Sequence, residues 1–135
     1  MEMTEKIKVG MTREEVSRVT ESNTALAMGS GSLPVYATPA MTALMEQAAA
    51  NLAEALLPEG WTSVGTALAI AHKAATPCGM ATRAVAEVTA VDGRRIVYRV
   101  TAYDAAGEIG SGTHERFAVE KAKFLAKANE KLKNS

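Results

Sequence analysis

The sequence of 135 residues has little cysteine, few aromatic residues and no net charge. Its one cysteine cannot form an internal disulfide bond, and with two histidines it offers no Cys/His cluster of the metal-binding type. Lysine and arginine together number 15, as do aspartate and glutamate. Because a nucleic-acid-binding protein normally carries a basic surface, this balance argues against that class.

Long apolar runs are absent as well. No stretch approaches the roughly 20 residues that a membrane-spanning helix needs, and the polar start MEMTEKIKVG is unlike a signal peptide. Hydrophobic residues still make up 47% of the chain, near the average of globular proteins. We therefore expect one cytoplasmic domain over residues 1–135, with a tail at residues 1–10 and a lysine-rich segment at residues 121–135.

A helix is predicted from Thr38 onward. Thr38 suits the N-cap and Pro39 the first helical position, while Pro58 and Gly60 end the segment. Apolar residues recur between these points at steps of three and four, and so form one face: Met41, Leu44, Met45, Ala48, Leu52, Ala55 and Leu56.

Beyond Trp61 the apolar pattern changes to a period of two, which is typical of strands. Thr66, Leu68, Ile70 and His72 share one face of the first such segment. Further strands are predicted at residues 81–91, 94–103 and 108–120, and the dipeptide Asp92-Gly93 is a strong hairpin signal. One helix followed by an antiparallel meander indicates an α+β fold.

Two segments before the helix are harder to interpret. In TREEVSRVTES, the spacing of Thr12 and Glu15 fits a capping box and favours a helix, whereas loose alternation allows an edge strand. The residues alone leave this open. The stretch SNTALAMGSGSLPVY is rich in serine and glycine, and we expect it to form a mobile loop.

The polar residues suggest a site without defining one. Thr38, Thr42 and Glu46 are four residues apart and form a ridge on one side of the helix. Glu46 falls on the flank of the apolar face, where a carboxylate is either simply solvated or partly buried and available for chemistry. His72 lies in line with core residues, and is either a strand-end histidine or one oriented by a carboxylate.

Residues near the end of the chain have plainer interpretations. His114 and Arg116 share one face of the last strand, and we expect them to pair at the surface. Gly110 and Gly112 lie inside that strand, which predicts a bulge or a close approach of another backbone.

Four stretches together carry a family resemblance: YATPAMTALMEQA, VGTALAIAHKAATPCG, VDGRRIVYRVTAYD and EIGSGTHERF. From about Val35 to Val119 the sequence resembles the hotdog-fold thioesterases of the fluoroacetyl-CoA thioesterase-like family. The resemblance implies an α+β hotdog fold, in which a curved antiparallel sheet wraps a long central helix. It also makes TREEVSRVTES the first strand.

The resemblance further implies an acyl-CoA thioesterase, which hydrolyses a short or medium acyl-CoA to free acid and CoA. The family's catalytic threonine, glutamate and histidine match Thr38, Glu46 and His72, and two substrate-binding positions match Gly65 and Arg116. Neither a metal nor a cofactor is implied beyond the CoA of the substrate. The expected assembly is a homodimer or a tetramer, with sites at or near the subunit interface.

The loop before the helix departs from the family. Members specific for fluoroacetyl-CoA carry a lid of phenylalanines there, whereas TALAMGSGSLPVY has none. This favours a general short or medium acyl group over fluoroacetyl. Two other functions stay open: a hotdog protein that binds acyl-CoA without turnover, and a hydratase-type enzyme that acts on the acyl chain.

Overall fold

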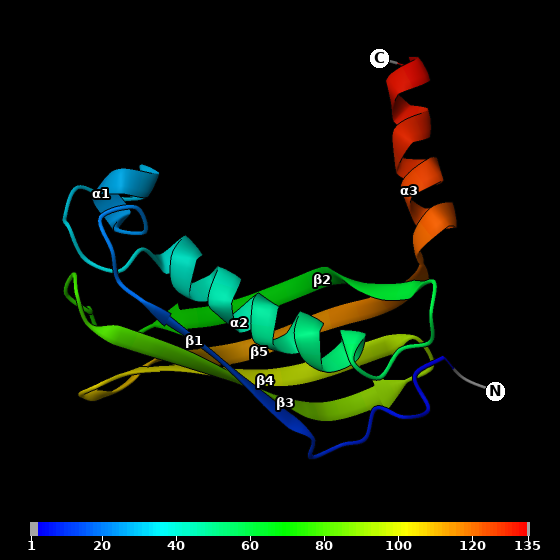
Figure 1. Ribbon diagram of the computed structural model, residues 1–135, viewed down its shortest axis with the longest axis horizontal. Helices are drawn as coiled ribbons and strands as arrows, with labels where there is room; N and C mark the ends of the chain where they lie inside the picture. The colour runs from blue at the N-terminus through cyan, green and yellow to red at the C-terminus, as the bar shows by residue number, and fades with distance from the viewer. Residues whose placement is uncertain (1–2, 135) are drawn as a thin grey trace.

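The computed structural model describes residues 3–134, so residues 1–2 of the predicted tail and residue 135 lie outside the described part. The elements in chain order are β1 (Thr12–Arg18), α1 (Ala25–Met28), α2 (Thr38–Glu54), β2 (Trp61–His72), β3 (Ala81–Asp92), β4 (Arg95–Asp104), β5 (Gly107–Glu120), α3 (Lys121–Asn129) and the 3-10 helix η1 (Glu130–Asn134). The strands form one antiparallel sheet in the order β1-β3-β4-β5-β2, and α2 lies across one face of it (Figure 1). The α+β architecture is as predicted.

Helix α2 is placed by its apolar face. Its buried residues are mostly small or flexible: Met41, Leu44, Met45, Ala48, Ala49, Leu52 and Ala53. Three of the five predicted residues before Ala55 are methionine or alanine, namely Met41, Met45 and Ala48, and these side chains adapt to a close surface. Ala55, expected on this face, is instead the exposed C-cap residue. The N-cap is Ala37, so the predicted N-cap role of Thr38 is wrong.

The stretch that the residues alone left open is a strand. β1 pairs antiparallel with β3, from Thr12 beside Glu87 to Arg18 beside Ala81. Hydrogen bonds between Val88 and residues 10–11 extend this pairing toward the N-terminus. Within the predicted tail, Ile7 is 2% exposed, and burial of its side chain anchors this segment to the core.

The serine- and glycine-rich segment contains one turn of helix, α1. The amide of Ala27 donates a hydrogen bond to the Thr24 hydroxyl, 3.2 Å away, which caps the start of this turn. Gly29 ends it with a φ of +71°, a backbone conformation that glycine adopts without strain. The predicted loop is therefore partly ordered by its own capping residues.

The hairpin between β3 and β4 is present, but its loop lies one residue later than predicted. Asp92 pairs with Arg95, so the two loop residues are Gly93 and Arg94. Gly93 has a φ of +61°, as the first loop position of such a hairpin requires.

A β-bulge in β2 changes which residues face the helix. The register against β5 shifts between Gly65 and Ala67, so that Gly65 lies beside Arg116 and His72 beside Gly110. Gly65 has an odd residue number and His72 an even one, so in an unbroken strand, where side chains alternate, they would lie on opposite faces. With the bulge, both lie opposite even-numbered residues of β5. Thr66, predicted on the His72 face, instead donates to the Glu115 side chain.

β1 and β2 are the edge strands of the sheet, so each has a neighbouring strand on one side only. From the end of β5, α3 rises away from the sheet on the side of β2 (Figure 1). The lysine-rich segment at the C-terminus is thus helical, and Phe124 and Leu125 in it are exposed. Within residues 3–134, no helix has both the length and the apolar character needed to cross a bilayer.

Gly112 marks the closest contact between β5 and β2, and this contact can be tested. A Cβ atom on Gly112 would lie 2.1 Å from the Ala69 carbonyl oxygen and 2.7 Å from the Ile70 Cα. Because both neighbours are backbone atoms, Gly112→Ala should lower the free energy of unfolding by about 1–3 kcal/mol. Urea denaturation measures this change.

Gly31→Ala is the matched control for that experiment. Its added methyl group would meet only the Ala25 Cβ, at 3.2 Å, on the surface. We expect a change within about 0.5 kcal/mol for this control. Equal stabilities of the two variants would show that β2 and β5 do not approach as closely as described.

Candidate functional site

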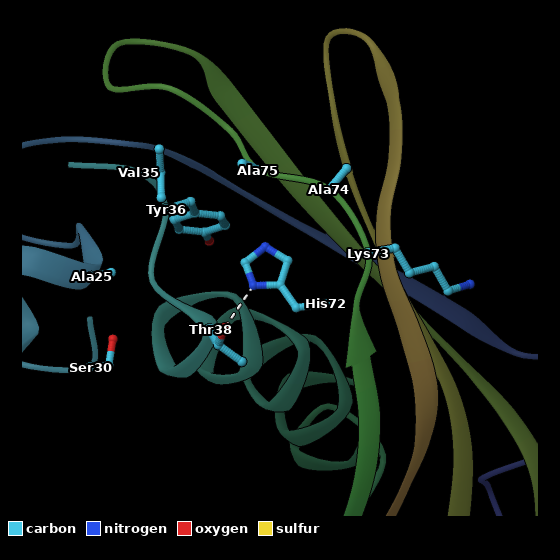
Figure 2. Close-up of a pocket in the computed structure, with 9 residues that line it drawn as sticks. All are labelled: Ala25, Ser30, Val35, Tyr36, Thr38, His72, Lys73, Ala74 and Ala75. Carbon is cyan, nitrogen blue, oxygen red and sulfur yellow. Dashed lines mark hydrogen bonds between the residues drawn. The ribbon is translucent and has the colours of Figure 1, made fainter. Parts of the chain in front are cut away.

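The hydroxyl of Thr38 is bonded to His72 at the start of α2. Its Oγ1 lies 2.7 Å from the His72 Nδ1 (Figure 2). Thr38 is free to make this bond because Ala37, not Thr38, occupies the N-cap, and no side chain caps the helix. The same hydroxyl–imidazole pairing is used where a histidine accepts a proton from a hydroxyl group.

The two partners differ in their access to solvent. Thr38 is exposed, whereas the second ring nitrogen of His72, Nε2, is buried and has no hydrogen-bond partner within residues 3–134. In Figure 2 the imidazole lies between Thr38 and Tyr36, with Nδ1 turned toward Thr38. A proton therefore reaches His72 most directly through the Thr38 hydroxyl.

A cavity of about 300 Å³ opens beside this pair. Apart from Lys73 and Tyr36, its lining consists of small side chains: Ala25, Ser30, Val35, Thr38, Ala74 and Ala75, with the imidazole of His72. Lys73 is held by Glu108, at 2.7 Å, and by Ser111, at 2.8 Å. Apart from this paired lysine, the cavity offers a wall of small side chains without formal charge to any group bound next to the Thr38–His72 pair.

Glu46 belongs to a second cluster, farther along α2. Its Oε2 lies 3.5 Å from the Arg116 Nη1, and a Cβ on Gly65 would come within 2.8 Å of that oxygen. The carboxylate thus rests against the strand at the one residue that has no side chain to exclude it. The side chain of Glu46 is 44% exposed, so it keeps contact with solvent.

Arg116 is anchored on β2. Its Nε donates to the Ser63 hydroxyl at 2.8 Å, and its Nη2 donates to the Ser63 carbonyl at 3.0 Å. Burial lowers the pKa of Arg116, while the charge of Glu46 opposes that shift. A guanidinium group stays charged in proteins, so Arg116 presents a fixed cation to the carboxylate.

His114 is the site residue that the sequence interpretation missed. It was expected to pair with Arg116 at the surface, but His114 is 2% exposed and Arg116 8%. The pairing itself is real, since Arg116 Nη1 lies 3.2 Å from His114 Nε2. The available signal was that His114 and Arg116 are two residues apart and so share one face of the strand. Their burial could not be predicted from this spacing, because it depends on α2 covering that face of β5.

The predicted residues thus form two groups. Thr38 and His72 are bonded, and Glu46, Gly65 and Arg116 are in contact. Within residues 3–134, no hydrogen bond or ion pair joins Glu46 to His72. Glu46 lies eight positions after Thr38 in the helix, which is about 12 Å along the axis. In a single chain the Nδ1 partner of His72 is therefore Thr38, and not the carboxylate.

Metal binding has no obvious location in this arrangement. Among residues 3–134, no group of three or more His, Cys, Asp or Glu side chains is placed to hold a metal ion. The expectation that the protein works without a metal or a separate cofactor stays a prediction.

Known proteins resemble this chain over most of its length. The profile of the family FlK, fluoroacetyl-CoA-specific thioesterase, matches residues 19–122. A fluoroacetyl-CoA thioesterase from Streptantibioticus cattleyicolor is 45% identical over 97 residues, which cover 72% of this chain and 70% of that protein.

Solved structures agree with the sequence match. A structure of the fluoroacetyl-CoA thioesterase FlK has a TM-score of 0.87 and 37% identity, covering 93% of this chain and 97% of the other. A hot-dog-like protein from Thermanaerovibrio acidaminovorans has a TM-score of 0.88 and 29% identity, covering 97% of both chains. The hotdog fold is thereby confirmed, and the chain belongs to the fluoroacetyl-CoA-specific thioesterase family of CoA-thioester hydrolases.

Proposed function

We propose that this protein hydrolyses a short or medium acyl-CoA to the free acid and CoA. The observation that carries the proposal is the bond between Thr38 Oγ1 and His72 Nδ1 beside a cavity lined mostly by small side chains. A hydroxyl–imidazole pair next to a site for an acyl group is what thioester hydrolysis requires.

Proton transfer is the proposed role of the Thr38–His72 pair. With the ring proton on Nε2, the Thr38 hydroxyl donates to Nδ1, which acts as the base. The attacking water gives up its proton through Thr38, and the imidazolium then protonates the leaving thiolate. General acid–base groups of this kind typically contribute about 10²–10⁴-fold in rate.

Glu46 is the proposed carboxylate of the reaction. It either orders the attacking water or attacks the thioester carbonyl itself, in which case water hydrolyses the resulting anhydride. Arg116 lies 3.5 Å away and balances its charge, and Gly65 leaves room for it. The acyl-CoA would lie along the ridge of α2 that runs from Thr38 to Glu46.

The acyl group is proposed to enter the cavity beside His72. Its volume of about 300 Å³ is at the lower end of the usual range for ligand pockets, which suits a short or medium chain. The segment before α2 carries α1 and no phenylalanine. A variant of FlK has been solved with fluoroacetate and CoA, which supports a CoA ester as the substrate class here.

A panel of acyl-CoAs assayed for free thiol tests the function. Release of one thiol per acyl-CoA consumed, fastest for short or medium chains, is the expected outcome. Tight CoA binding without thiol release would favour the binding protein, and hydration of an enoyl chain with the thioester intact would favour the hydratase. A preference for fluoroacetyl-CoA over all other esters would contradict the proposed substrate range.

Catalysis by His72 and Glu46 predicts a specific pattern in variants. His72→Ala should reduce thiol release by about 10²–10⁴-fold because the base is lost, and Glu46→Gln should reduce it strongly because only the charge is removed. Circular dichroism and thermal melting should show that both variants fold. Glu54→Gln, the same chemical change on the same helix, should keep the parental rate. Wild-type rates for both site variants would refute the assignment.

Gly65→Ala should separate activity from stability. The added methyl group would meet Glu46 Oε2 at 2.8 Å, which is the far end of a flexible side chain. The methyl group would also lie 3.3 Å from the His114 Cε1 and 3.4 Å from the Arg116 Nη1, so these side chains must shift slightly as well. We therefore expect a small loss of Tm and a much larger fall in the turnover number, because the carboxylate is displaced. An unchanged turnover number would mean that Glu46 does not act from this position.

A homodimer is the proposed assembly. β2 is an edge strand of the sheet, and an exposed edge is a ready surface for pairing with a second copy. Light scattering at micromolar concentration should give twice the mass of the chain or a multiple of it. A stable monomer would contradict the proposal. The cytoplasmic location expected from the sequence likewise stays a prediction.

A further inference from the structure

His114 is the most completely bonded titratable side chain next to Glu46. Its Nδ1 lies 2.9 Å from the Ala67 carbonyl oxygen, and its Nε2 lies 3.2 Å from the Arg116 Nη1. The ring also stacks on Tyr98, with centroids 6.1 Å apart and an angle of 25° between the planes. These three contacts, from β2, β5 and β4, leave the imidazole no second orientation.

The partners of the ring determine its protonation. A carbonyl oxygen only accepts hydrogen bonds, so Nδ1 must carry the proton that is donated to Ala67. A guanidinium only donates, so Nε2 must be bare and accept from Arg116. Only the neutral imidazole meets both conditions. Burial acts in the same direction, because it lowers the pKa of His114.

A bare Nε2 has a consequence for Glu46. Nε2 and the Glu46 Oε2 lie 3.9 Å apart, and both are acceptors, so neither can bond to the other. The Nη1 group of Arg116 faces both of them, at 3.2 Å and 3.5 Å. The remaining guanidinium nitrogens are held by Ser63. Among residues 3–134, His114 is thus the acceptor hydrogen-bonded to the end of Arg116 nearest the carboxylate.

We propose that His114 is a positioning residue of the thioesterase site, which as a neutral acceptor holds Arg116 Nη1 against Glu46. The inference rests on the proposed function of Glu46 and Arg116 in hydrolysis. His114 itself touches no reacting atom and transfers no proton. Other charged groups near the ring are Arg116 and Glu46 on the helix-facing side and Glu115 on its own strand.

Two amide variants separate the two hydrogen bonds of the ring. His114→Gln places an amide near the former Nε2 and can still accept from Arg116. His114→Asn is shorter, so its amide can still donate to the Ala67 carbonyl but does not reach Arg116. We expect both to fold, with His114→Asn losing about tenfold in kcat at little change in KM, and His114→Gln keeping most of it.

A double-mutant cycle shows whether His114 acts through Arg116. In an Arg116→Gln background, adding His114→Asn should reduce kcat by less than twofold, because the group that it positions is already gone. A side chain that only supports the fold would cost the same factor in both backgrounds. Equal kcat for the Asn and Gln variants, or additive losses in the cycle, would overturn the inference.

Two measurements decide the inference even if no acyl-CoA is hydrolysed, an outcome that would count against the proposed function alone. Nitrogen NMR of the labelled imidazole should show a neutral ring with the proton on Nδ1 at neutral pH. Crystal structures should show Nη1 beside Glu46 in the parent and in His114→Gln, but displaced in His114→Asn. A protonated ring, or an unmoved guanidinium in His114→Asn, would refute the positioning role.

Discussion

The close approach of α2, β2 and β5 is the constraint on which the rest of the structure depends. Glycine occurs where these elements meet: a Cβ on Gly112 would strike the backbone of β2, and one on Gly110 would lie 2.7 Å from the Met41 sulfur of α2. Because the strands and the helix lie so close together, polar groups at this contact bond mostly to one another, although the Nε2 of His72 has no partner within residues 3–134. The site residues are such groups.

The bulge in β2 turns this contact into a site. It brings Gly65 and His72 to the same face, although an even strand would separate them. One strand then meets α2 twice, with Thr38 bonded to His72 and Glu46 resting against Gly65. Ala67, directly after the bulge, has its carbonyl oxygen 2.9 Å from the Nδ1 of His114. A single backbone irregularity thus serves both clusters.

Much of the fold follows from local sequence patterns. The three- and four-residue spacing in α2, the period of two in the strands and the Asp92-Gly93 signal each depend on neighbouring residues, and each is present in the structure. The bulge is a different kind of feature, because it depends on how β2 registers with β5. No local pattern shows it, and Thr66 was therefore assigned to the wrong face. The residues alone could not decide between helix and strand at β1 for the same reason, because pairing with β3 outweighs the capping-box spacing of Thr12 and Glu15.

The candidate site was predictable only in part. Thr38 and Glu46 share a ridge by helical spacing, which sequence alone gives. That Thr38 is not the N-cap depends on the extended backbone at Ala37, and the burial of His114 depends on α2 covering β5. Both are tertiary effects. Family resemblance identified Arg116 but not the histidine that holds it, because a positioning residue carries no chemical signature of its own.

The two histidines of the chain have different hydrogen-bond partners, which suit the same type of side chain to two different roles. His114 has both ring nitrogens engaged by groups that cannot exchange roles, a carbonyl and a guanidinium, so its proton is fixed. His72 has one nitrogen bonded to a hydroxyl, which can donate or accept, and that hydroxyl is exposed. A ring whose partner can both donate and accept a hydrogen bond can gain and lose a proton during a reaction. A ring whose partners can only donate or only accept keeps one protonation state and one orientation. These surroundings favour the proposed proton transfer at His72, at the end of β2, and a fixed ring at His114, in the middle of β5, where Glu46 lies 3.9 Å away.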